Sequence, residues 1–173
     1  FLVNIPVTST TTALGRCRTA NAMTINKDAI GGGNGRLTGK LQVDSLGTLV
    51  LGVDDIGEIV LADTLTGKST ASPLVVKHGG KVEFKLRSST SYDKLSTNST
   101  ATFNGSTILL KPASGLAIKD GDTFTILSAQ TAVPTDSFKL ETQGFPQTVT
   151  FTAAADTIGG GFRIVVTAHG STK

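Results

Sequence analysis

Apolar and polar residues alternate along much of this chain, most regularly between Lys81 and Ala129. In the segment KVEFKLR, Val82, Phe84 and Leu86 fall on one face, and the charged residues fall on the other. A period of two predicts a half-buried β-strand. This stretch therefore predicts structural strands, and it contains no recognisable catalytic motif.

The same stretch ends in a strand with a different pattern. Asp120-Gly121-Asp122 predicts a turn, because Gly and Asp adopt backbone conformations that other residues resist. Phe124 and Ile126 then restart the alternation, but Leu127 falls on the opposite face. We therefore expect this strand to be covered on both faces.

Short alternating segments recur along the rest of the chain, usually after a glycine. The recurring motif appears as GTLVL (47–51), GKVEFKL (80–86), GSTILL (105–110), GDTFTIL (121–127) and GFRIVV (161–166). Further strands are predicted over 22–26, 37–43, 58–62, 74–77, 137–141 and 148–153. No long stretch carries the helical spacing of apolar residues together with a cap.

Composition supports an all-β fold. Threonine, a β-branched residue, suits strands, and the 20 glycines suit tight turns between them. Charged residues make up only 17% of the chain. The spacing of the glycine motif is too irregular for a strict repeat. Short strands joined by tight turns build either a β-solenoid or a jelly-roll-like β-sandwich, and both architectures stay open.

The N-terminal segment FLVNIPVTSTTT predicts an extended strand ahead of this body. Phe1, Val3, Ile5 and Val7 share one face, and Pro6 restricts the strand to a sheet edge because it lacks a backbone donor. Two interpretations stay open: the strand completes the sheet of a neighbouring subunit, or it forms an edge of its own sheet.

The glycine run 31–35 predicts a flexible hinge after this N-terminal part. The expected organisation is an arm with leading strands over 1–30, an all-β body over 31–168 and a tail over 169–173. An apolar start at Phe1 without a basic flank predicts an exported protein that has lost its signal peptide.

The charge distribution argues against nucleic-acid binding, and the cysteine content limits which disulfides can form. The net charge is +3 and the basic residues are scattered, so the basic stripe expected of a nucleic-acid-binding protein is missing. No apolar run reaches the length of a membrane-spanning helix. The single cysteine, Cys17, excludes a disulfide within the chain. In an exported protein it could pair with a second chain, but the favoured interpretation is a small buried hydrophobe.

Candidate chemistry is sparse. His78 and His169 have no neighbouring metal ligands in sequence, and the nucleophile motif G-x-S-x-G does not occur. We therefore predict that the protein is not an enzyme and has no cofactor. Asp120 and Asp122, with Asp54 and Asp55 as weaker additions, are calcium candidates, although the same residues are common in ordinary turns.

Two triplets match the glycosylation sequon. They begin at Asn98 and Asn104 and lie in or beside the central stretch, at predicted turns. Such triplets also arise by chance in a sequence rich in Thr and Asn, so both interpretations stay open.

One segment carries a resemblance to a known group of proteins. Tyr92-Asp93-Lys94-Leu95 and the residues from Gly121 to Leu127, within the range 74–129, resemble the C-terminal part of exported bacterial β-helix proteins such as autotransporter passengers. The resemblance implies a secreted or surface-displayed β-rich scaffold. The chain differs from an autotransporter in its shorter length and in having no membrane-barrel segment.

Together these observations predict a secreted structural protein that lies outside the cell or on its surface. We expect it to bind copies of itself and to form a filament, sheath or surface layer. An adhesin that binds a surface glycan or a host protein is the alternative, and a viral capsid protein is a second alternative.

Overall fold

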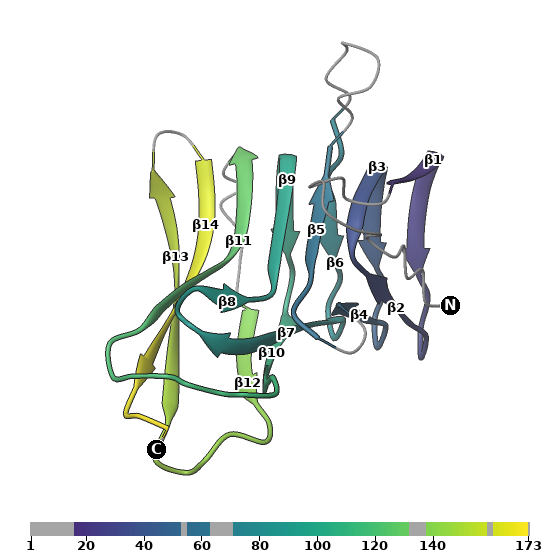
Figure 1. The fold of residues 1–173 in the computed structure, drawn as a ribbon. Helices are drawn as coiled ribbons and strands as arrows, with labels where there is room; N and C mark the ends of the chain where they lie inside the picture. The colour runs from purple at the N-terminus through teal and green to yellow at the C-terminus, as the bar shows by residue number, and fades with distance from the viewer. Residues whose placement is uncertain (1–15, 53–54, 63–70, 132–137, 159–160, 173) are drawn as a thin grey trace.

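The computed structural model describes residues 16–52, 55–62, 71–131, 138–158 and 161–172, and side-chain positions are described from residue 23 onwards, except at Ile158. These residues form fourteen β-strands and no helix. The strands build two sheets that face each other across one apolar core (Figure 1). The prediction of an all-β protein is confirmed, and the two-sheet arrangement is sandwich-like.

The larger sheet has eight strands. Along its length they are β1 (Arg16–Ile25), β3 (Gly35–Val43), β5 (Glu58–Leu61), β9 (Lys94–Phe103), β11 (Thr123–Thr131), β14 (Gly161–His169) and β13 (Thr150–Ile158), while β6 (Leu74–Val76) pairs with β3 and β9. The smaller sheet has six strands. They are β12 (Phe138–Thr142), β10 (Ser106–Pro112), β7 (Lys81–Ser88), β4 (Thr48–Leu51) and β2 (Ile30–Gly33), with β8 (Ser91–Tyr92) on β7.

Most neighbouring strands are parallel. From β1 to β5, consecutive strands lie in alternate sheets, so the chain re-enters each sheet from the same end. Among the described residues, ten strand pairs are parallel. The antiparallel pairs are β7 with β8, β11 with β14, and β13 with β14. A jelly roll is antiparallel, so this pairing differs from the jelly-roll form of the prediction.

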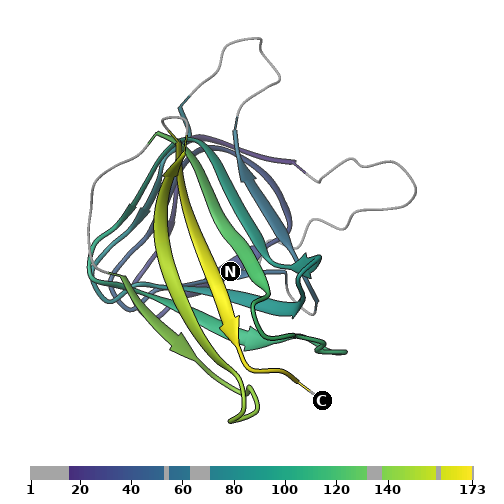
Figure 2. The same cartoon turned by 90° about the vertical axis from the view of Figure 1, so that its left-hand side faces the viewer.

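The core consists of apolar rows that run across the strands. In the smaller sheet, Leu49 is in register with Val82, and Val82 is in register with Ile108. All three side chains are fully buried, so the alternation read from the sequence is confirmed there. Figure 2 views the molecule along these rows, with the two sheets curving around the space that the core fills.

The burial of both Ile126 and Leu127 has a different cause from the one expected. Both side chains are buried in the same core, so the prediction that the strand is covered on two opposite faces is wrong. The pairing of β11 with β14 shifts register between Thr125 and Leu127, which marks a β-bulge. Since a bulge adds one residue to one strand, it shifts the phase of the alternation. Leu127 is consequently in register with the buried Leu95 of β9.

The glycine run 31–35 is not a flexible hinge, and that prediction is wrong. Gly31, Gly32 and Gly33 form most of β2 and pair with β4. A Cβ atom on Gly32 would lie 1.8 Å from the carbonyl oxygen of Val50. Glycine is required here because the two backbones approach closely, and not because the chain must bend.

The residues after β14 are also more ordered than a free tail. His169 ends β14, and the amide of Gly170 donates to Asp120 Oδ1 at 2.8 Å. The amide of Thr172 donates to the carbonyl of Ile118 at 2.9 Å. Residues 170–172 are therefore attached to the loop that precedes β11.

We predict that Gly32→Ala lowers the free energy of unfolding by about 2–4 kcal/mol, because the new methyl group overlaps the β4 backbone. Gly121→Ala is the matched control. Gly121 has a positive φ of 83° but open space around its Cβ position, so its cost is expected to be about 1 kcal/mol. Urea unfolding of both variants measures the difference. Equal losses would contradict the steric explanation.

Candidate functional site

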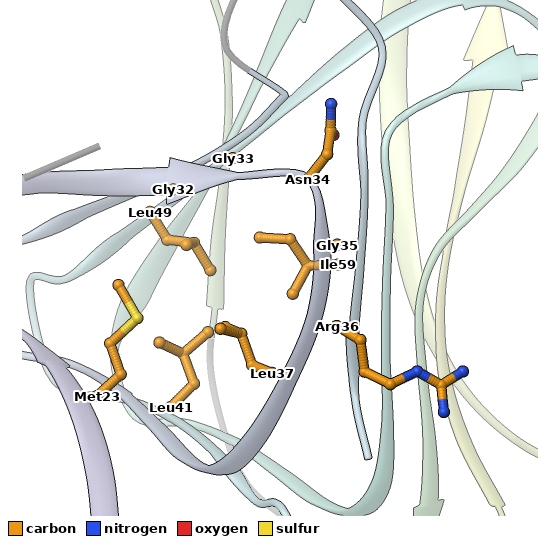
Figure 3. A pocket seen from close by; sticks show the side chains of 10 residues that line it. All are labelled: Met23, Gly32, Gly33, Asn34, Gly35, Arg36, Leu37, Leu41, Leu49 and Ile59. Atoms are coloured by element: carbon orange, nitrogen blue, oxygen red, sulfur yellow. The ribbon is translucent and has the colours of Figure 1, made fainter. Parts of the chain in front are cut away.

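The end of the molecule formed by β1 and β2 contains a partly open apolar pocket (Figure 3). Its cavity volume is only about 20 Å³, which leaves room for about one water molecule. The lining residues come from the first five strands and the turn after β2. They are Met23, Gly32, Gly33, Asn34, Gly35, Arg36, Leu37, Leu41, Leu49 and Ile59.

The chemistry of this pocket is that of an apolar cavity. Figure 3 shows the side chains of Met23, Leu41 and Leu49 turned toward one another, while those of Asn34 and Arg36 point away from them. The side-chain oxygen of Asn34 accepts a hydrogen bond from the amide of Glu58 at 3.1 Å. No acid or base therefore faces the cavity, and its volume of about 20 Å³ is too small for a ligand.

The opposite end, formed by β12 and β13, exposes part of the core. Its apolar side chains pack against the buried cluster but are only half-buried. They are Phe138, Leu140, Phe145, Phe151 and Ala153. The rings of Phe145 and Phe151 meet edge to face, with 4.7 Å between their centroids. Aromatic groups left partly exposed at a sheet end are typical of contact surfaces.

Between the two ends lies a buried ion pair. The Nζ atom of Lys85 lies 3.2 Å from Oδ2 of Asp93, and both residues are almost inaccessible to solvent. Asp93 Oδ1 accepts a hydrogen bond from the amide of Gly57 at 2.5 Å. Oδ2 accepts one from the amide of Lys85 at 2.7 Å. The Lys85 ammonium also donates to the carbonyls of Leu51 and Gly52.

These contacts join three parts of the chain that are distant in the sequence. Asp93 lies between β8 and β9, Lys85 lies in β7, and Gly57 precedes β5. Since every oxygen of the carboxylate has a donor, the pair satisfies the requirement that buried charges be fully hydrogen-bonded. Burial raises the pKa of Asp93 to about 6, and the Lys85 charge and the two amides offset only part of this increase.

Aromatic and charged side chains lie near the Lys85–Asp93 ion pair. Tyr92 packs edge to face on Phe124 at 5.4 Å, and the Lys94 ammonium lies 4.9 Å from the centre of the Tyr92 ring. Arg87 forms an ion pair with Asp55 near the surface. Three residues of the Tyr92–Leu95 motif thus have structural roles, since Asp93 is fully hydrogen-bonded and Leu95 is buried.

Sequence reasoning missed Lys85. The alternation of KVEFKLR places it on the polar face, yet it is buried because Asp93 and two carbonyl groups surround its ammonium. The motif at Tyr92–Leu95 gave a signal for Asp93 but none for its partner.

The predicted calcium candidates act as turn residues. Asp122 Oδ2 accepts a hydrogen bond from the amide of Lys119 at 2.9 Å, and Asp120 Oδ1 accepts the bond from Gly170. Asp55 is paired with Arg87, and Asp54 lies outside the described residues. Within the described ranges, no three His, Cys, Asp or Glu residues are grouped so as to hold a metal ion.

The predicted subunit-contact residues Phe1, Val3, Ile5 and Val7 also lie outside the described residues. A strand interaction for them therefore stays a prediction.

The two histidines lie apart. His78 is exposed at a turn, with its ring beside Gly105, and His169 is within 2.9 Å of the hydroxyl of Thr152. Neither arrangement places a nucleophile beside an acid–base pair.

The two sequons differ in accessibility. Asn104 is exposed at the turn between β9 and β10, whereas Ser106 of the same triplet is fully buried. Asn98 lies within β9, and its side-chain oxygen accepts a hydrogen bond from the amide of Ser72 at 3.2 Å. Of the two asparagines, Asn104 is therefore the more accessible to modification.

Comparison of the sequence with known protein families and with curated proteins gives no match. In the part of the chain that the structure describes, no helix is long and apolar enough to cross a membrane.

We predict that Asp93→Asn and Lys85→Met each lower the free energy of unfolding by about 3–5 kcal/mol, because each leaves a buried polar partner unsatisfied. The double variant should lose less than the sum of the two. Lys77→Met is the control. Lys77 pairs with Asp44 at the surface, so its loss should be below about 1 kcal/mol. Additive losses for the buried pair would contradict the interaction.

The raised pKa of Asp93 predicts a pH dependence of stability. Between pH 4 and pH 6 the folded state binds more protons at this group than the unfolded state does, so its contribution to stability falls as pH rises. The advantage of the wild type over Asp93→Asn should shrink across this window, by at most about 3 kcal/mol. Denaturant unfolding at half-unit pH steps measures it. An advantage that grows with pH would refute the assignment.

Proposed function

We propose that this protein is a secreted structural subunit that assembles with copies of itself into an extracellular filament, sheath or surface layer. The observation that carries the proposal is that both sheets end in edge strands. Among the described residues, β1 and β13 border the larger sheet, and β2 and β12 border the smaller one. Figure 1 places these edges at opposite ends of the stacked strands.

Edge strands favour strand addition. A strand at a sheet edge presents backbone groups that can pair with another chain. Many proteins bind partners in this way, with backbone hydrogen bonds supplying affinity and alternate side chains supplying specificity. Phe1, Val3, Ile5 and Val7 have the alternation that such a strand needs.

The polar chemistry of the described residues supports a structural role. Asp93, Lys85, Asp120 and Asp122 are engaged with the backbone, and the pocket between β1 and β5 is apolar. An extracellular or cell-surface location rests on the resemblance of residues 74–129 to exported bacterial β-helix proteins.

We predict that deletion of residues 1–12 prevents assembly and leaves a folded monomer. Size-exclusion chromatography with light scattering, together with negative-stain microscopy, compares it with the full chain over a range of concentrations. Val3→Ser/Ile5→Ser should reproduce the loss by removing apolar contacts, whereas the control Asn4→Ser should assemble normally.

Two outcomes contradict the proposal. If the full chain stays monomeric at every concentration, self-assembly is wrong. If the deletion unfolds a monomeric protein, residues 1–12 belong to the subunit's own sheet.

A further inference from the structure

We propose that Asn104 is a site of spontaneous deamidation, at which the backbone nitrogen of Gly105 attacks the asparagine side chain and His78 acts as the general base. The proposal is independent of the proposed function. It follows from the exposure of Asn104, the backbone hydrogen bonds around Gly105 and the position of the His78 ring.

The reaction consumes only water. The backbone nitrogen of Gly105 bonds to Cγ of Asn104 and gives up its proton, while the bond from Cγ to the side-chain nitrogen breaks and ammonia leaves. Water then opens the resulting five-membered imide. Attack at Cγ gives aspartate, and attack at the main-chain carbonyl carbon gives isoaspartate. A following glycine favours ring closure, because it has no Cβ atom to restrict the approach.

Both reacting groups are available in the turn between β9 and β10. Asn104 is exposed there. Within the part of the chain that the structure describes, no hydrogen bond engages its side-chain amide or the N–H group of Gly105. The flanking backbone is held, since the amide of Asn104 donates to the carbonyl of Val76 at 3.1 Å and the amide of Gly79 donates to the carbonyl of Gly105 at 3.0 Å.

His78 places a base beside the attacking residue. It is exposed in the turn between β6 and β7. A Cβ atom on Gly105 would lie 2.6 Å from Cδ2 and 3.3 Å from Nε2 of His78, so the edge of the ring occupies the space that a side chain would fill. A neutral imidazole has one nitrogen that accepts a proton. It can take the proton of the attacking nitrogen and return it to the departing one.

A second Asn-Gly pair in the chain provides a contrast. The side-chain oxygen of Asn34 accepts a hydrogen bond from the amide of Glu58 at 3.1 Å. Gly35 is buried in β3, where it is in register with Ile59 of β5. Ring closure at Asn34 would disrupt this strand pairing. The structure therefore distinguishes two sites that are identical in local sequence.

Conversion at Asn104 would change the turn in two ways. Isoaspartate adds one carbon atom to a main chain that is hydrogen-bonded on both sides, and the fully buried Ser106 follows directly. Either product also lacks the side-chain nitrogen that a glycan would occupy, so deamidation removes the glycosylation sequon at this position.

Peptide mapping by mass spectrometry tests the site. After incubation of the folded full chain at neutral pH, aspartate and isoaspartate should both form at position 104. Over the time in which half of Asn104 is converted, Asn34 should remain intact. In urea, where the strand pairing is lost, the two asparagines should react at similar rates. Equal rates in the folded protein, or no conversion at Asn104, would overturn the proposal.

Substitution of His78 tests the base. His78→Gln should slow conversion at Asn104 by about tenfold, which is below the roughly 10²–10⁴-fold effect of a fully positioned base because His78 is exposed. Added imidazole should restore part of the lost rate. Lys77→Gln is the matched control in the same turn and should leave the rate unchanged. If the ring merely shields Gly105, His78→Gln will instead accelerate conversion. That result, or an unchanged rate, overturns the role of His78.

Discussion

Parallel strands cannot be joined by a tight turn, and this constraint organises the molecule. To place β4 beside β2, the chain must first cross to the other sheet, where it forms β3. Repetition of this path gives two sheets that share one core and that grow along a single direction. It also leaves both sheets with edge strands at each end of the described residues, so the same constraint that builds the core creates the surfaces through which we propose that copies join.

The contacts of Asp93 link three segments that are distant in the sequence. Its carboxylate accepts hydrogen bonds from Gly57 and from the Lys85 backbone, and the Lys85 ammonium reaches the carbonyl of Gly52. A buried ion pair contributes little net stability relative to apolar packing, but it tolerates few alternative geometries. The pair therefore connects β7 to the segments that precede β5 and β9, while the apolar rows supply most of the stabilisation.

The sequence predicted the strands well because each is short, alternating and bounded by turn residues. It failed where contacts between distant residues decide the outcome. The glycines around Gly32 were interpreted as a hinge because the close approach of Val50 is not visible in a linear sequence. The bulge before Leu127 and the burial of Lys85 likewise depend on partners in other strands. The apolar pocket brings together five strands, so no local motif indicated it.

Fibre diffraction of aligned assemblies of the full chain tests the central claim most directly. If copies add to one another through their edge strands and continue the sheets, the strands lie across the fibre and give a meridional reflection at about 4.8 Å. Closed oligomers that cannot be aligned, or a reflection near this spacing on the equator, would contradict growth along the direction in which the strands stack.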